Sequence, residues 1–158
     1  MISLILTAPD DAEALAQLLS ALVPAAAEGL VREVAVLGAN DICQAVAADA
    51  GADVYPADAF ADAFDRAKGP WVCGLPLAAL LAPDWIEVLA AHIAREPAAA
   101  ARLVSRSLWP MAWREGWLAP KAAAVKALAA SAAARPCEQD LQRLARRSGR
   151  RLRILGRA

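Results

Sequence analysis

Short apolar runs alternate with helical segments along the first hundred residues, and this alternation is the strongest constraint on the fold. The predicted strands cover residues 2–6, 34–37, 53–55 and 71–75. Helices are predicted from Asp10 or Asp11, from Asp41 to about Ala50, around residues 58–67, and from Pro83 to about Arg95. Strands that alternate with helices form right-handed βαβ units, so we expect an α/β fold whose mostly parallel sheet is covered on both faces.

The pattern is less regular after residue 100. We expect a strand over 103–105, a Trp-rich loop over 107–117, helices over 121–131 and 139–148, and a last strand over 151–155. Neither an internal repeat nor a domain boundary is visible, which predicts one domain over residues 1–158. Ligands of such sheets gather beyond the carboxyl ends of the strands, here residues 7–11, 38–41 and 75–79.

Charge is unevenly distributed along a chain whose net charge is zero. Residues 1–65 carry eleven acids and one base, Arg32, whereas the chain after Pro136 carries two acids and seven arginines. Such an asymmetry is typical of a binding tail or of a solvated basic helix and edge strand, and we favour the second. Nucleic-acid binding by these arginines is a lesser hypothesis.

The sequence also constrains the compartment. The apolar start is short and is followed by Asp10, Asp11 and Glu13, which does not match a secretory signal. The longest uncharged run has fifteen residues, too few to cross a bilayer. Three widely spaced cysteines without a C-x-x-C pattern indicate reduced thiols. We expect a cytoplasmic protein, with peripheral association with a membrane left open.

Residues 69–87, GPWVCGLPLAALLAPDWIE, resemble a segment of the family 2 glycosyltransferases, which have the GT-A fold. The family pattern is G-D-W-L-L-F-L-D-A-D-T-x-L-x-P-D-W-L-E, and the two match without a gap. The resemblance implies a GT-A-like three-layer domain. The family's Asp-x-Asp pair, which binds Mg²⁺ or Mn²⁺ and the nucleotide diphosphate, falls on Pro76 and Ala78. We therefore expect a degenerate member with no metal site and no cofactor.

Two further segments resemble the family's nucleotide-binding region. Residues 2–24 are similar to its first strand and helix, and VLGAND at 36–41 corresponds to its V-V-D-D/G-G-S-T-D motif. The family aspartate that binds the base aligns with Gly38. By this resemblance the candidate nucleotide-binding residues are Thr7, Ala8, Asp10, Gly38, Asn40 and Asp41.

Residues 137–155 resemble the family's E-D-x-D-L-x-x-R-L-R-R-x-G-x-R-V-R-x-L segment, again without a gap. The aspartate of the family's E-D pair is the general base in inverting members, and Glu138 occupies its place. Arg146 and Arg147 are candidates to neutralise a diphosphate in place of a metal.

Tryptophan supplies a second candidate site. Trp109, Trp113 and Trp117 stand four residues apart, partly within a segment that resembles the family's acceptor region. They could form an exposed platform for a sugar or a protein partner, or fill the core, and both interpretations stay open. His92 has no ligand partners at suitable spacing, so we expect a partly exposed helical side chain.

Two functional hypotheses follow from these residues. The favoured one is a pseudoenzyme, a ligand-binding or protein-interaction domain without metal-dependent transfer. The alternative is an active, metal-independent glycosyltransferase that takes a sugar from a nucleotide sugar, with Glu138 as general base.

Overall fold

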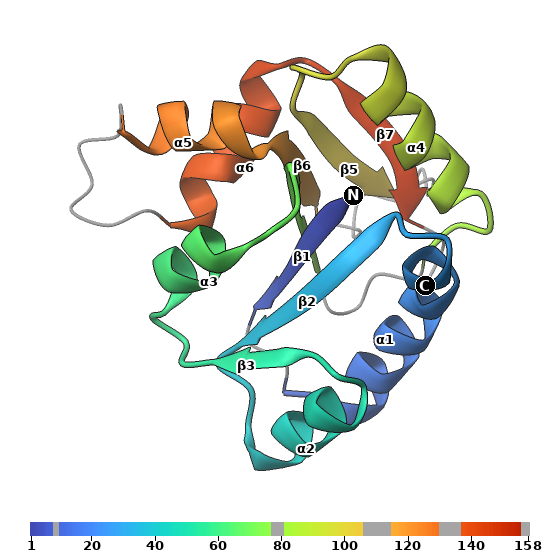
Figure 1. The fold of residues 1–158 in the computed structure, drawn as a ribbon, viewed down its shortest axis with the longest axis vertical. Helices are drawn as coiled ribbons and strands as arrows, with labels where there is room; N and C mark the ends of the chain where they lie inside the picture. Colours follow the sequence, from blue (N-terminus) through green and yellow to red (C-terminus); the bar gives the residue numbers. More distant parts are fainter. Residues whose placement is uncertain (8–9, 77–80, 106–114, 130–136, 156–158) are drawn as a thin grey trace.

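A sheet forms the centre of the structure, a computed structural model that describes residues 1–7, 10–76, 81–105, 115–129 and 137–155 (Figure 1). Within these residues the sheet has seven strands in the order β3-β2-β1-β4-β6-β5-β7. The strands are β1 (Ile2–Thr7), β2 (Val31–Leu37), β3 (Asp53–Tyr55), β4 (Trp71–Leu75), β5 (Ala101–Ser105), β6 (Gly116–Pro120) and β7 (Arg151–Leu155). All predicted strands are present, although β2 starts three residues earlier than expected.

The sheet is mostly parallel, as predicted. β1 pairs in parallel with β2 and β4, and β2–β3 and β5–β7 are parallel pairs, whereas β6 runs antiparallel to β4 and β5. The prediction of a loop up to Trp117 was wrong at its end, because Trp117 lies in β6. All five residues of β6 are buried, so the strand lacks the alternation that marks a half-buried strand in the sequence.

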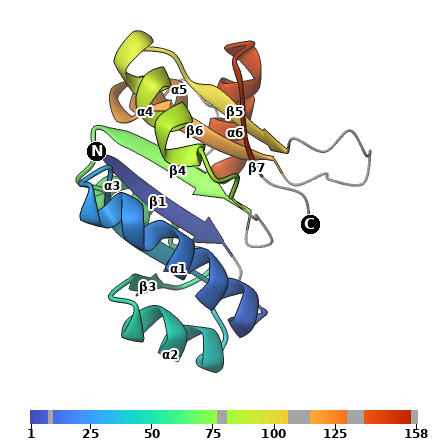
Figure 2. The same cartoon turned by 90° about the vertical axis from the view of Figure 1, so that its right-hand side faces the viewer.

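Helices cover both faces of the sheet. They are α1 (Ala12–Ala27), α2 (Asp41–Asp49), α3 (Phe60–Arg66), α4 (Trp85–Arg95), α5 (Lys121–Ala129) and α6 (Glu138–Arg147). α1, α2 and α4 lie on the face turned toward the viewer in Figure 2, and α3, α5 and α6 lie behind the sheet. This is the three-layer arrangement expected for the fold class. Among the described residues no helix is both long and apolar enough to cross a membrane.

Each interface between a helical layer and the sheet has its own apolar core. Leucines of α1, together with Trp85 and Leu89 of α4, pack with residues of β1 and β4 in the first core. Phe60 and Phe64 of α3 pack with Trp117 of β6 and with α5 and α6 in the second. Burial on both faces accounts for the nearly continuous apolar character of the central strands.

The helix starts show where local prediction was accurate. Asp11 caps α1 by accepting hydrogen bonds from the N–H groups of Glu13 and Ala14, as expected. The cap of α2 is Asn40 and not Asp41, because the Asn40 side-chain oxygen accepts the Cys43 N–H at 2.9 Å. The helix expected from Pro83 begins at Trp85, which leaves Asp84 at the N-cap position and not inside the helix.

Candidate functional site

The carboxyl edge of the sheet brings together a carboxylate and two donors from distant segments. Thr7 ends β1, Trp117 lies in β6, and Glu138 is the first residue of α6. The Thr7 hydroxyl donates to Glu138 Oε2 at 3.2 Å, and the Trp117 indole N–H donates to Glu138 Oε1 at 3.1 Å. We call these three residues the Glu138 clamp. The clamp positions the candidate base at the edge where ligands of such sheets bind.

Trp117 is a core residue. Its side chain is fully buried and meets the Phe60 ring edge-on with 6.4 Å between ring centroids. The indole also lies against the backbone of Gly74 in β4, since a Cβ added at Gly74 would be 2.2 Å from Trp117 Nε1. A buried ring cannot serve as an exposed platform, so the core interpretation describes Trp117. Trp109 and Trp113 lie outside the described residues.

The candidate nucleotide-binding residues lie on neighbouring loops. The Asn40 amide donates to the Asp10 carbonyl oxygen at 3.3 Å, so the loop after β1 contacts the loop after β2. Asp10 and Asp41 are exposed at this edge. Gly38 has a φ of 66°, and a Cβ there would be 2.9 Å from the Ala57 Cβ, so the glycine suits the turn after β2. Ala8 lies outside the described residues.

No carboxylate follows β4 in the sequence at the place where the family resemblance puts a divalent ion. β4 ends at the buried Leu75, and the sequence continues as Pro76, Leu77, Ala78 and Ala79 without a carboxylate. Mg²⁺ and Mn²⁺ prefer hard oxygen ligands, so the side chains at this position do not fit the ion that the fold implies. Within the described ranges no group of three or more His, Cys, Asp or Glu side chains could hold a metal.

The two candidate phosphate-binding arginines are far from the clamp. Arg146 follows Glu138 by eight residues on α6, a separation of about 12 Å along the helix axis. Its guanidinium lies 3.7 Å from the Glu115 carboxylate, which also accepts a hydrogen bond from Arg102 Nε at 3.1 Å. Arg147 is exposed in the last turn. The structure therefore does not bring Arg146 and Arg147 together with Glu138.

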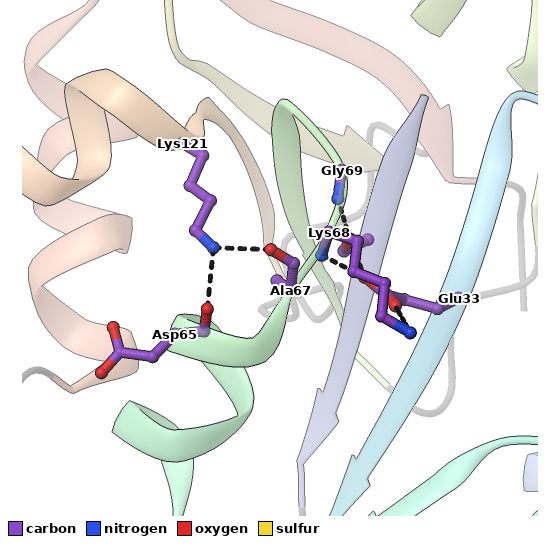
Figure 3. A network of polar contacts seen from close by, with 7 residues as sticks. Glu33, Asp65, Ala67, Lys68, Gly69 and Lys121 are labelled. Carbon is purple, nitrogen blue, oxygen red and sulfur yellow. Dashed lines mark hydrogen bonds and ion pairs between the residues drawn. The ribbon is translucent and has the colours of Figure 1, made fainter.

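A second polar cluster, which the sequence analysis did not identify, lies near the amino-terminal ends of β1 and β4 (Figure 3). The Ser3 hydroxyl and the Lys68 backbone N–H each donate to Glu33 Oε1 at 2.5 Å. Ser3 also accepts the Gly69 N–H at 2.8 Å. We call Ser3, Glu33, Lys68 and Gly69 the Glu33 clamp. The sequence gives little signal for this cluster, because β1 also contains Thr7 and β2 also contains Arg32, so Ser3 and Glu33 do not stand out.

Lys121, the first residue of α5, connects α5 to the carboxyl end of α3, close to the Glu33 clamp. Its ammonium donates to the carbonyl oxygens of Asp65 at 3.0 Å and Ala67 at 2.5 Å, so it caps the carboxyl end of the helix (Figure 3). The same ammonium lies 5.7 Å from the centre of the Phe64 ring. These contacts tie α5 to the segment that leads into β4.

His92, Cys43 and Cys73 are buried, and Cys137 is partly buried. The prediction of a partly exposed His92 was wrong, because the residue is only 7% exposed. Its ring contacts Trp71 edge-on, and Nε2 lies 2.9 Å from the Ala99 carbonyl oxygen. Cys43, Cys73 and Cys137 are free thiols. Burial raises the pKa of the Cys43 and Cys73 thiols, which disfavours the reactive thiolate.

Comparison with known proteins identifies the fold. The chain matches no family model and none of the curated proteins. It is similar to solved glucosyl-3-phosphoglycerate synthase from Mycobacterium tuberculosis, with a TM-score of 0.68, 18% identity, and coverage of 100% of this chain and 72% of that chain. The complex of that enzyme with Mn²⁺, UDP and glucosyl-3-phosphoglycerate gives a TM-score of 0.63 at 17% identity, with 99% and 70% covered.

A third similar structure is mannosyl-3-phosphoglycerate synthase from Rubrobacter xylanophilus. Its TM-score is 0.56 at 17% identity, and 67% of this chain is covered. The match spans only 40% of that enzyme's length. At these identities the similarity shows the fold, and the GT-A-type architecture predicted from the sequence is confirmed.

Proposed function

We propose that this chain is a glycosyltransferase-like binding domain that takes up a ligand or a protein partner at the carboxyl edge of its sheet, without metal-dependent sugar transfer. The observation that carries the proposal is the Glu138 clamp. Both oxygens of the carboxylate that the family resemblance assigns as base already accept hydrogen bonds, one from Thr7 and one from Trp117. Glu138 thus joins α6 to β1 and β6, which gives it a role that needs no reaction.

The end of β4 supports the same proposal. A departing nucleotide diphosphate develops negative charge, which a divalent ion ordinarily stabilises. The segment from Pro76 to Ala79 has no side chain able to hold such an ion. Loss of electrostatic help of this kind slows a reaction by roughly 10²–10³-fold. A domain with this segment retains the shape of the fold without that source of catalysis.

The ligand that best suits the edge is a nucleotide sugar. UDP is bound by the M. tuberculosis glucosyl-3-phosphoglycerate synthase, which shares the fold. In this chain the loops that carry Asp10 and Asn40 contact each other and offer exposed polar groups beside the end of β1. A protein partner at the Trp-rich segment, through Trp109 and Trp113, is the other form of the proposal.

An active, metal-independent transferase is the second candidate. The observation in its favour is the position of Glu138, whose carboxylate is held in a fixed orientation at the ligand edge. Each carboxylate oxygen keeps a second lone pair that could accept a proton from an acceptor hydroxyl. In that case Thr7 and Trp117 would orient the base.

Thermal unfolding with nucleotide sugars tests both candidates. A ligand that binds only the folded chain stabilises it by about 2.7 kcal/mol at 100 times its Kd. The binding domain predicts a higher melting temperature with one of the UDP, GDP, CDP or dTDP sugars, with or without Mn²⁺, and no released nucleotide diphosphate. Glu138→Gln should keep this shift, and Glu28→Gln, an exposed site after α1, is the matched control.

The outcomes separate the candidates. Release of nucleotide diphosphate that is lost in Glu138→Gln but kept in Glu28→Gln would establish the transferase and overturn the binding-only proposal. A chain that none of the sugars stabilises does not bind a nucleotide sugar. The hypothesis of a protein partner is then tested with Trp113→Ala, which should weaken the affinity of the chain for a purified partner. Trp117 is unsuitable for that test because it is buried.

A further inference from the structure

Opposite charges lie at the two opposite edges of the sheet. The acidic part of the chain, residues 1–65, supplies edge strand β3, and the arginine-rich part after Pro136 supplies edge strand β7. Five strands separate these two edges. The sequence alone shows that the charges are segregated, and the topology shows that they are displayed at the two ends of one continuous sheet (Figure 1).

The edge at β3 is lined by aspartates, which we call the acidic edge (Asp49, Asp53, Asp58 and Asp62). All four are exposed, and among the described residues none of their side chains forms a hydrogen bond or an ion pair. Asp58 and Asp62 border a hollow of about 360 Å³, together with Tyr55 and Arg66. The acidic edge therefore carries negative charge that its own chain neutralises only in part.

The edge at β7 is lined by arginines, which we call the arginine edge (Arg147, Arg150, Arg151 and Arg153). Arg150 binds Glu96 at 2.8 Å. Arg147 and Arg151 are exposed and form no ion pair within the described part of the chain. β7 pairs with β5 on its inner side. On its outer side Leu81 bridges Leu155 and the Ala82 N–H donates to the Ile154 carbonyl oxygen at 2.7 Å, so described residues pair with the carboxyl end of the strand there and leave its first residues, which carry Arg151, unpaired on that side.

We propose that a second copy of this chain docks its acidic edge on the arginine edge of the first. Guanidinium groups bind carboxylates through directed, charge-assisted hydrogen bonds, and each edge offers the groups that the other lacks. The net charge of zero means that no overall repulsion opposes the approach of two copies. The contact is heterologous, because each copy uses two different surfaces, and it therefore leaves one edge of each kind open at the ends.

This inference does not rest on the proposed function, because neither edge includes the Glu138 clamp. It also selects one partner for the arginines. A nucleic acid or another polyanion could bind the arginine edge, but it would leave the acidic edge without a role. A second copy uses both edges at once, which is why the observations favour it.

Sedimentation velocity over a range of protein concentrations tests the proposal. The average mass should rise with concentration in roughly 20 mM salt, and association should weaken about tenfold or more in roughly 300 mM salt, since screening shortens the range of the attraction. Asp53→Arg with Asp58→Arg should abolish association, as should Arg147→Glu with Arg151→Glu. These exposed positions should leave the circular dichroism spectrum unchanged.

A fourfold variant makes the test specific to the edges. Combining both pairs of reversals returns the net charge to zero and exchanges the signs at positions 53 and 58 on one edge and 147 and 151 on the other, so contacts between these positions again join opposite charges and association should return. The matched control combines Arg147→Glu and Arg151→Glu with Glu28→Arg and Glu87→Arg, exposed acids away from the acidic edge, and should stay monomeric. A monomeric wild type at low salt, a monomeric fourfold variant, or a control that associates equally would each overturn the proposal. Binding of a single-stranded oligonucleotide by a monomeric wild type would assign the arginine edge to nucleic acid instead.

Discussion

Two carboxylates hold opposite ends of strand β1, and the contrast between them bears on the role of Glu138. At the start of β1 the Ser3 hydroxyl donates to Glu33, and at its end the Thr7 hydroxyl donates to Glu138. Each carboxylate also accepts an N–H from a third segment of the chain. The Glu33 clamp and the Glu138 clamp thus use the same bridging arrangement.

The clamps differ in location and in charge. The Glu33 clamp lies near the amino-terminal ends of the strands and includes the Lys68 ammonium, 3.7 Å from Glu33 Oε2. The Glu138 clamp lies at the carboxyl edge and has neutral donors, a hydroxyl and an indole. Since the Glu33 clamp forms away from the ligand edge, a bridging carboxylate in this fold requires no ligand. The position of Glu138, and not its hydrogen bonds, is what favours a functional role.

The largest expected effect on stability comes from Gly74, whose backbone lies against the Trp117 indole of the Glu138 clamp. Gly74→Ala would place a methyl group 2.2 Å from Trp117 Nε1 and 2.4 Å from Cε2, so the buried indole must move. We expect a loss of about 3 kcal/mol in the free energy of unfolding, measured by urea denaturation. Gly69→Ala in the Glu33 clamp should cost less, because the nearest atoms, the Ser3 backbone nitrogen and hydroxyl, lie at 2.8 Å.

A control separates the clash from the backbone effect. Gly51 has a φ of 74° with no atom within 4 Å of an added Cβ, so Gly51→Ala introduces only the backbone penalty, about 1 kcal/mol. Gly74 is not among the glycines with positive φ, so alanine there carries no such penalty. If Gly74→Ala cost no more than Gly51→Ala, the packing of Trp117 against β4 would be refuted.

The next largest effect on stability is expected when the Glu138 carboxylate is replaced. Glu138→Ala removes the acceptor of the Trp117 N–H and should cost about 1–2 kcal/mol. Glu138→Gln keeps one oxygen for the indole, and its amide can donate to the Thr7 hydroxyl, so its cost should stay below about 0.5 kcal/mol. Urea denaturation of both variants provides the measurement. Equal losses in the two variants would mean that the charge of Glu138, and not its hydrogen bonds, holds the clamp.

Much of the fold was predictable because its signals are local. Apolar runs marked β1 and β4, Asp11 caps α1 as expected, and Gly51, with a φ of 74°, follows the C-cap of α2. β6 was missed because a short, fully buried strand that ends in Pro120 has no periodic pattern. Local signals report caps and apolar faces, but they do not report strand pairing.

The site was predictable only in outline for the same reason. Resemblance to a family indicated Glu138, but its partner Trp117 depends on the pairing of β6 with β4, where Trp117 lies opposite Gly74. The partners of Glu33 likewise come from residues 3 and 68, far away in the sequence. Contacts between distant segments require the register of the sheet, which no local pattern specifies.

The smallest expected effect is the acid sensitivity of the Glu33 clamp. Burial raises the pKa of the Glu33 carboxyl, but hydrogen bonds from Ser3 and Lys68 and the nearby cationic charges lower it more, so the pKa lies below its ordinary value of 4.5. The folded chain then holds this proton more weakly than the unfolded chain does. The stabilisation is therefore fully present above pH 4.5 and is lost as the pH falls through the lowered pKa.

Glu33→Gln removes this titration. When the pH falls from about 6 to about 3, the free energy of unfolding should decrease more for wild type than for Glu33→Gln. The difference between the two decreases should be on the order of 1 kcal/mol or less. The change in melting temperature over that range measures the difference, with the exposed Glu28→Gln as control, which should follow wild type. An identical acid response of wild type and Glu33→Gln would show that the Ser3 and Lys68 hydrogen bonds do not favour the ionised carboxylate. The contrast between the two clamps would then rest on position alone.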